Sequence, residues 1–297
     1  MPLIIYVPKR FHGASLNLID EANAIIDEYR GQGFILTLRQ LYYQFVARDL
    51  LENKHSNYKR LGNILNDARL AGLVDWEAIE DRTRQLERNA HWEDPADAIQ
   101  AAAHWFQLDK WKGQKNYVEV WIEKEALTGV IEGICNRYDV PYFACRGYTS
   151  QSEQWRAGER FYNHMVGDKK VIVLHLGDHD PSGMDMTRDN TDRLTIFTQK
   201  HPTKHITVNR LALNMDQIRQ YKPPHAPAKK TDSRSPEYIR KYGDKSWELD
   251  ALNPSVIRDL IEKNIKKYLN VRKFNERVAL EKEYKNQLEE LANNWEG

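Results

Sequence analysis

Four short apolar runs that alternate with helix-forming segments constrain the fold of this chain more than any other feature. The runs cover residues 117–122, 140–145, 171–176 and 206–213. Strands that alternate with helices in this way form a parallel sheet with helices on its faces. The sequence therefore predicts an α/β domain with a Rossmann-like, mostly parallel sheet over residues 113–297, ending in a charged helical extension.

The residues before the sheet have a different, helical pattern. Apolar residues recur at helical spacing until a stop at Gly33, a second helix starts near Thr37, and a third ends at Gly72 before the brief extended segment Leu73-Val74. Three short helices and an extended segment suggest a winged helix. We predict an all-helical or winged-helix DNA-binding domain over residues 1–112.

Composition limits the classes of partner and the cellular setting. The 297 residues carry a net charge of +1, so a nucleic-acid surface must come from local clusters of Lys and Arg. Cys135 and Cys145 are far apart without a CxxC spacing, which argues against a disulfide framework or a zinc cluster. No apolar run approaches the ~20 residues of a membrane span. We expect a cytoplasmic protein that does not enter a membrane.

Three acidic residues follow two of the predicted strands. Glu123 comes after the first run, and Asp178 and Asp180 come after the third. Open α/β sheets present their ligands at the carboxyl ends of the strands, so we expect these carboxylates to converge. Hard oxygen ligands suit Mg²⁺ or Mn²⁺, which neutralise charge at a scissile phosphate. The sequence predicts a metal site at Glu123, Asp178 and Asp180.

Two alternative interpretations of the aspartate pair stay open. The first is an ordinary turn with solvated acids. The second is a calcium loop, because Asp178, Asp180 and Ser182 match the opening of an EF-hand and Asp189 falls at its last position. A strand precedes this loop where an EF-hand has a helix, Asp185 occupies the usual apolar position, and the last ligand is not Glu.

The second predicted helix contains an arginine and a tyrosine on one face. Arg39 lies four residues before Tyr43, which is the helical spacing of neighbouring side chains. A guanidinium can hold a phosphate and favour the phenolate, which makes a tyrosine a better nucleophile. The alternative is that both members of the Tyr42-Tyr43 pair pack in the helical core.

Several cations adjoin these acids or lie in a proline-bounded segment, residues 222–236, that we expect to be a long surface loop. Such side chains can hold DNA phosphates, although solvated charge is the alternative for the loop. The candidate DNA contacts are Lys124, Arg146, Lys229, Lys230 and Arg234.

The acidic pattern resembles a Toprim domain, in which a Glu follows an early strand and a DxDxxG follows a later one. Glu123 and the segment from Asp178 to Gly183 match it residue by residue. The resemblance implies that Glu123, Asp178 and Asp180 bind Mg²⁺ for strand cleavage, joining or primer synthesis.

Together with Arg39-Gln40-Leu41-Tyr42-Tyr43, this pattern resembles the A subunit of type IIB DNA topoisomerase (topoisomerase VI) and the related meiotic double-strand-break protein. The resemblance covers residues 36–189 and suggests a short phage or bacterial relative, which we expect in the cytoplasm, nucleoid-associated or phage-encoded. It implies attack by Tyr43 to leave a 5′-phosphotyrosyl link, with the tyrosine of one protomer meeting the metal of another in a homodimer.

Three functions follow as hypotheses. The first is Mg²⁺-dependent DNA double-strand cleavage by Tyr43, with Arg39 positioning the phosphate. The chain has no GxxxxGK[ST] loop, so topoisomerase activity would need a separate ATPase subunit. The second is a Toprim nuclease that uses water, and the third is a non-catalytic winged-helix DNA-binding protein.

Overall fold

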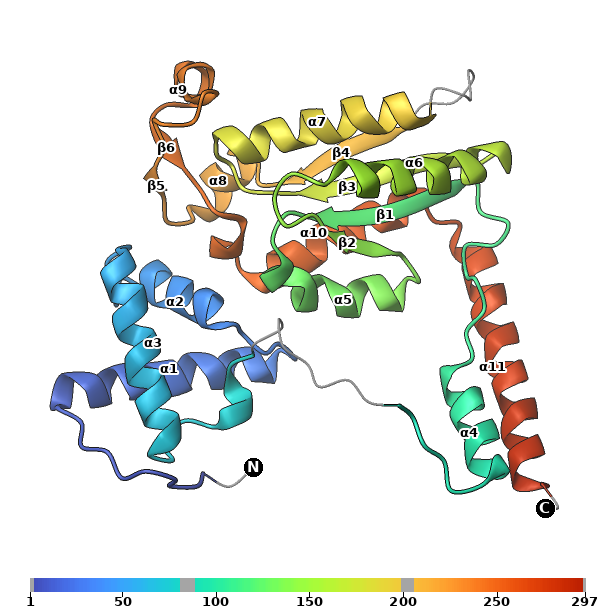
Figure 1. Cartoon of the computed structure of the whole chain (residues 1–297), viewed down its shortest axis with the longest axis horizontal. Coiled ribbons are helices and arrows are strands. Elements are labelled where there is room, and N and C mark those ends of the chain that lie inside the picture. Colours follow the sequence, from blue (N-terminus) through green and yellow to red (C-terminus); the bar gives the residue numbers. More distant parts are fainter. Residues whose placement is uncertain (1–2, 81–88, 199–205, 296–297) are drawn as a thin grey trace.

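A four-stranded parallel sheet forms the centre of the larger part of the molecule (Figure 1). This computed structural model describes residues 3–80, 89–198 and 206–295. The spatial order of the strands is β2-β1-β3-β4. Their bounds are β1 Asn116–Ile122, β2 Tyr142–Ala144, β3 Lys170–Leu176 and β4 Thr207–Ala212. The predicted mixed α/β architecture with a parallel sheet is confirmed.

The register of the strands decides where the acidic residues lie. Ile122 at the end of β1 is paired with Leu176 at the end of β3, so the segments that follow both strands leave the sheet side by side. β2 is shorter than the predicted run 140–145, because its pairing with β1 extends only from Tyr142 to Ala144.

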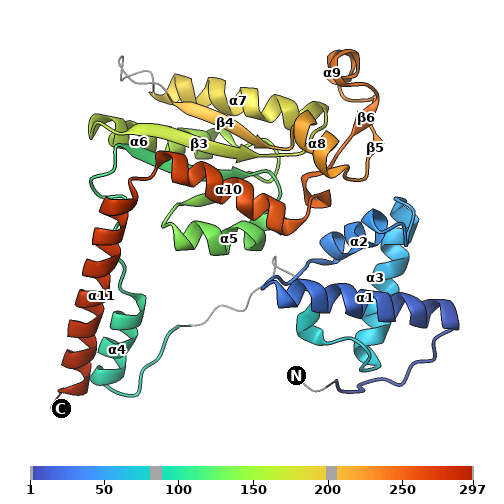
Figure 2. The same ribbon diagram turned by 180° about the vertical axis from the view of Figure 1, so that it is seen from behind.

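Helices cover both faces of the sheet. On one face lie α6 (Gln151–Val166) and α7 (Pro181–Thr198), and on the other lie α5 (Thr128–Arg137) and α10 (Pro254–Tyr268), as Figures 1 and 2 show. The alternation of side chains along β1 produces two cores. Val118, Val120 and Ile122 pack toward α5 and α10, whereas Tyr117 and Trp121 pack with Phe161 of α6.

The N-terminal part packs α1 (Gly13–Gly31), α2 (Leu38–Ala47) and α3 (His55–Leu70) around one core. Thr37 and Gln40 form a capping box that fixes the start of α2. The expected extended segment Leu73-Val74 is a bend before the short helix η1 (Trp76–Ala78). The bridge that does form joins Leu36 to Ile79.

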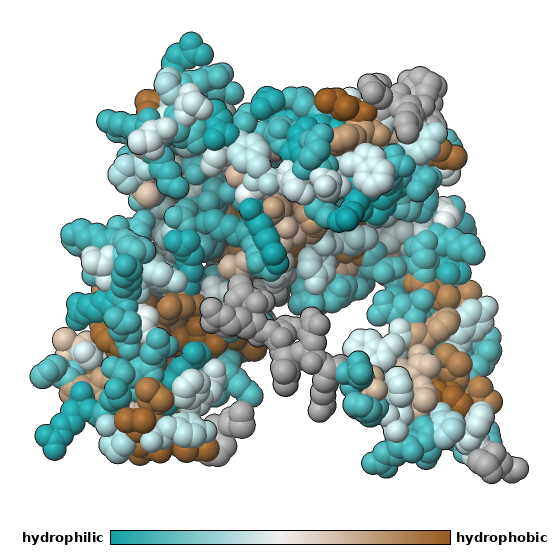
Figure 3. Space-filling view, in the orientation of Figure 1, coloured by the Kyte–Doolittle hydropathy of each residue, from teal (hydrophilic) through white to brown (hydrophobic). Residues whose placement is uncertain are grey.

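A pair of packed helices that are distant in sequence projects from the sheet (Figures 1 and 2). It consists of α4 (Pro95–Trp105) and α11 (Val271–Asn293), which pack along each other. Apolar side chains gather along this pair in Figure 3. The helix α4 lies within the predicted first domain, residues 1–112, but it packs against the C-terminal helix α11.

The segment after β4 is more ordered than the predicted surface loop 222–236. It contains α8 (Met215–Tyr221), a two-stranded ladder of β5 (Ala226–Pro227) and β6 (Lys245–Ser246), and α9 (Ser235–Tyr242). Two further short helices are η2 (Glu125–Leu127) and η3 (Leu249–Ala251). Within the residues described, no helix is both long and apolar enough for a bilayer span.

Candidate active site

Glu123 and Asp178 meet at the carboxyl ends of β1 and β3. The Glu123 backbone N–H donates to the Leu176 carbonyl at 2.9 Å, and its Oε2 accepts the backbone N–H of Asp178 at 2.8 Å. Both residues are buried. Gly177 between them has no room for a side chain, because an added Cβ would lie 2.8 Å from Glu123 Oε2.

Asp180 occupies the start of α7. Its Oδ1 accepts the Gly183 backbone N–H at 2.6 Å and the Ser182 hydroxyl at 3.1 Å, which satisfies donors that a helix start leaves free. A Cβ at Gly183 would overlap the Asp178 carbonyl. Glycine therefore lets the helix start close to the aspartates.

A second acidic pair, which the sequence analysis missed, lies against Asp178. Glu248 and Asp250 belong to the segment that contains η3, and Leu249 N–H donates to Asp178 Oδ1 at 2.8 Å. The neighbouring backbone of His179 and Trp247 forms two reciprocal hydrogen bonds of 2.8 and 3.0 Å. These bonds fix the second pair beside the predicted one.

Lys124 lies among these acids instead of facing solvent. Its Nζ is 2.7 Å from Glu248 Oε2, 2.9 Å from Asp250 Oδ1 and 3.1 Å from Asp178 Oδ2. Burial alone lowers the pKa of this ammonium, but the three carboxylates outweigh burial and raise the pKa. The expectation that Lys124 is free to hold a DNA phosphate is corrected here, because its three N–H donors face carboxylates.

Arg210 of β4 braces the aspartate loop and was also missed by the sequence analysis. One terminal nitrogen donates to the Gly183 carbonyl at 2.8 Å, and the other donates to the carbonyls of Gly177 at 3.0 Å and Asp178 at 2.6 Å. The planar guanidinium suits several acceptors at once. Its positive charge also acts on Glu123.

The predicted tyrosine helix lies on the second acidic pair of the same chain. The Tyr43 side chain lies near Glu248 and Asp250, whose charges act on its hydroxyl, and the tyrosine is 5% exposed. Arg39 is 3.9 Å from both Glu248 and Asp250, and its guanidinium lies over the Tyr58 ring. The structure thus brings Arg39 and Tyr43 to a cluster that includes Asp178.

The surroundings of Tyr43 oppose ionisation of its hydroxyl. Burial, followed by the charges of Asp250 and Glu248, raises its pKa, and the opposing effect of Arg39 is smaller. The expectation that Arg39 favours the phenolate is therefore corrected for this arrangement, because the two carboxylates are neighbours of the same hydroxyl.

The acidic cluster holds more carboxyl groups than cations. Burial raises the pKa of Glu123 and of Asp250, and it raises the pKa of Asp178 to about 8. Asp250 Oδ2 is buried and has no hydrogen-bond partner. Such oxygen donors fit a hard divalent ion, although no ready-made group of three metal ligands occurs among the residues described.

The remaining predicted contacts lie outside this cluster. Arg234 pairs with Asp232 and Asp185 and stacks on the Tyr148 ring. Arg146 is exposed and paired with Glu125. Lys229 and Lys230 are both exposed. The loop cations are therefore not brought to Glu123, Asp178 and Asp180.

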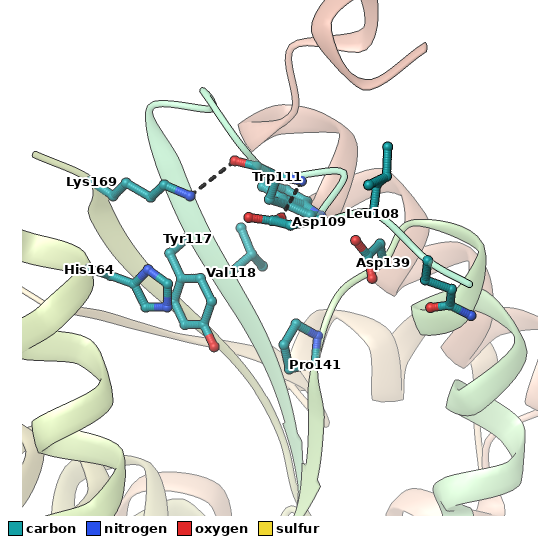
Figure 4. A pocket seen from close by; sticks show the side chains of 10 residues that line it. Leu108, Asp109, Trp111, Tyr117, Val118, Asp139, Pro141, His164 and Lys169 are labelled. Atoms are coloured by element: carbon teal, nitrogen blue, oxygen red, sulfur yellow. Dashed lines mark hydrogen bonds between the residues drawn. The ribbon is translucent and has the colours of Figure 1, made fainter. Parts of the chain in front are cut away.

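A separate pocket of about 300 Å³ opens at the other end of β1 (Figure 4). Its polar side chains bond to neighbouring groups in the protein, since Lys169 donates to the Trp111 carbonyl at 3.0 Å and Asp139 accepts the Lys110 N–H at 2.8 Å. His164 stacks on Tyr117. None of the residues that line this pocket belongs to the acidic cluster.

Comparison of the chain with models of known families, with characterised proteins and with solved structures finds no match.

Proposed function

We propose that this protein cleaves both strands of DNA by a Mg²⁺-dependent transesterification in which Tyr43 is the nucleophile. The observation that carries the proposal is the position of Tyr43 and Arg39 of α2 on an acidic cluster formed by segments distant in sequence. A nucleophile, a phosphate-binding cation and a set of carboxylates are the components that this chemistry needs.

Glu123, Asp178 and Asp180 are the proposed ligands of Mg²⁺, which Mn²⁺ can replace. When bound, the ion supplies positive charge that stabilises a scissile phosphate. The exposed face of Arg39, whose side chain is 45% exposed, holds a phosphate oxygen. The Tyr43 oxygen then forms a bond to phosphorus as its proton leaves, the bond from phosphorus to the 3′ oxygen breaks, and the 3′ oxygen takes a proton from water to leave as a hydroxyl. The protein becomes linked to the 5′ phosphate.

The proton of the Tyr43 hydroxyl needs an acceptor in this reaction. The Glu248 carboxylate acts on that hydroxyl, and Lys124 and Arg39 lower the pKa of Glu248, which keeps it ionised and open to a proton. We assign Glu248 as the group that receives the proton.

The resemblance to the topoisomerase VI A subunit supplies the wider context of the proposal. It implies a winged-helix domain around α1 to α3, a Toprim domain around the sheet, a homodimer on DNA and a separate ATPase subunit where strand passage occurs. In this chain each tyrosine lies at the acids of its own protomer, so we propose that a dimer supplies one complete site per strand.

Incubation with supercoiled plasmid tests the proposal. With Mg²⁺ or Mn²⁺, denaturation without protease should give DNA ends linked to protein, and Tyr43→Phe should lose these adducts. Replacing Asp178 and Asp180 by Asn should lower cleavage at least a hundredfold. Adducts that persist in Tyr43→Phe contradict the proposed nucleophile, and intact plasmid under all conditions favours a DNA-binding protein without catalysis.

The raised pKa of Tyr43 favours a second candidate function. A buried, neutral tyrosine is a poor nucleophile, and the same carboxylates and metal can activate water for hydrolysis. This Toprim nuclease would leave free DNA ends in the same experiment, and Tyr43→Phe would cleave normally.

A further inference from the structure

Enzymes that cleave phosphodiesters often hold two metal ions about 4 Å apart. We infer that in this protein Lys124 takes the place of one of them, so that the site holds a single divalent ion. The inference rests on the proposed metal site and concerns how many ions it accepts.

The first observation is the set of contacts that Lys124 makes. An ammonium has three N–H donors, and those of Lys124 meet one oxygen each of Asp178, Glu248 and Asp250, at 3.1, 2.7 and 2.9 Å. This ammonium is a compact positive charge. It lies among these three carboxylates, and it would share Asp178 with an ion bound by Glu123, Asp178 and Asp180.

The second observation is the number of acidic and basic side chains in the cluster. The five carboxylates of the cluster are those of Glu123, Asp178, Asp180, Glu248 and Asp250, and the three cations that act on them are Arg39, Lys124 and Arg210. Five carboxylates therefore share three cations, which leaves acids that a divalent ion can neutralise. Asp178 contacts Lys124 directly and donates its backbone N–H to Glu123, so it connects the acids around Lys124 to the proposed metal ligands.

The third observation is a buried oxygen of Asp250 that accepts no hydrogen bond. The Asp250 side chain is 1% exposed, and its Oδ2 accepts no hydrogen bond, with the Arg39 Nε 3.9 Å away. A buried carboxylate oxygen without a partner is costly. If Lys124 is removed, Asp178, Glu248 and Asp250 become a buried set of acids that lacks its cation, and a second divalent ion can bind there.

Mn²⁺ titration of the full chain, followed by electron paramagnetic resonance and calorimetry, tests this inference. We expect one Mn²⁺ per chain for the original protein, two for Lys124→Met, and one again for Lys124→Met combined with Asp250→Asn. Lys59→Met, which removes an exposed charge on α3, is the matched control and should bind one. Circular dichroism and thermal melting verify that each variant is folded.

The outcomes separate this inference from the proposed function. One Mn²⁺ in Lys124→Met, or two in the original protein, overturns the role of Lys124 and leaves the metal site intact. No Mn²⁺ in the original protein contradicts the metal site itself. If Lys124→Met does not fold, Asp250→Asn and Lys124→Arg still decide, because both should keep one Mn²⁺, and loss of the ion in Asp250→Asn would overturn the inference.

Discussion

At the scale of single residues, the sequence predicted the acids that follow strands but not the groups that surround them. Glu123 and Asp178 were predictable because a parallel sheet aligns the ends of its strands. Glu248, in contrast, contacts Lys124 across 124 positions of the chain, and no local pattern connects the two. Arg210 looks like an ordinary strand residue until its contacts with the loop carbonyls are known.

Gly183 gives a prediction at the residue scale. Because a Cβ at this position would overlap the Asp178 carbonyl, Gly183→Ala should shift the start of α7 and lower the free energy of unfolding by about 1–3 kcal/mol. It should also weaken Mn²⁺ binding. Urea unfolding and Mn²⁺ titration measure the two effects.

Gly133 is the matched control for this prediction. It lies in α5 with nothing within 4 Å of an added Cβ, so Gly133→Ala should raise the free energy of unfolding by roughly 0.5–1 kcal/mol, because alanine favours a helix. Equal effects of the two substitutions would refute the claim that Gly183 is required for close approach to Asp178.

At the scale of elements, β1 and β3 were predicted to within one residue of their observed starts, because both are apolar runs buried on two faces. The segment 222–236 was predicted as a loop because its prolines break regular patterns. Its β5 pairs with β6, nearly 20 residues later. Such a short ladder depends on a distant partner and leaves little periodicity in the sequence.

We predict that a buried ion pair stabilises the packing of α4 against α11. Glu281 of α11 pairs with Lys110 at 2.9 Å and accepts the Leu108 N–H at 2.8 Å, and both charged side chains are largely buried. Glu281→Ala should leave these donors unsatisfied and cost about 1–3 kcal/mol. Amide hydrogen exchange of α4 should accelerate accordingly.

The exposed Glu289, on the same helix, is the control for this prediction. Glu289→Ala removes the same charge from α11 and should change exchange in α4 by less than twofold, because surface charges contribute little to stability. If exchange in α4 of Glu281→Ala stays as slow as in the original protein, apolar packing alone holds α4 and α11 together.

At the scale of the whole molecule, one chain joins parts that the sequence analysis assigned to two protomers. The resemblance to the topoisomerase VI A subunit implies that a tyrosine meets the metal of a partner. In this structure α2 packs on η3 of its own chain, Asn253 donates to the Tyr29 hydroxyl at 3.1 Å, and the charges of Glu248 and Asp250 act on Tyr43. Motif spacing alone carries no information about which chain a side chain contacts.

Mixing two inactive variants tests whether cleavage uses one chain or two. Tyr43→Phe lacks the proposed nucleophile, and Asp180→Asn lacks a proposed metal ligand. Because Tyr43 lies at the acidic cluster of its own chain, a mixture of the two variants should give no more protein-linked DNA than either variant alone. A mixture of the original protein with Tyr43→Phe, which keeps complete sites on some chains, should retain adducts in proportion to the original protein. If the two inactive variants together restore adducts, α2 must leave η3 and reach the acids of a partner, and the contact between Tyr43 and Glu248 would then describe the protein before it engages DNA.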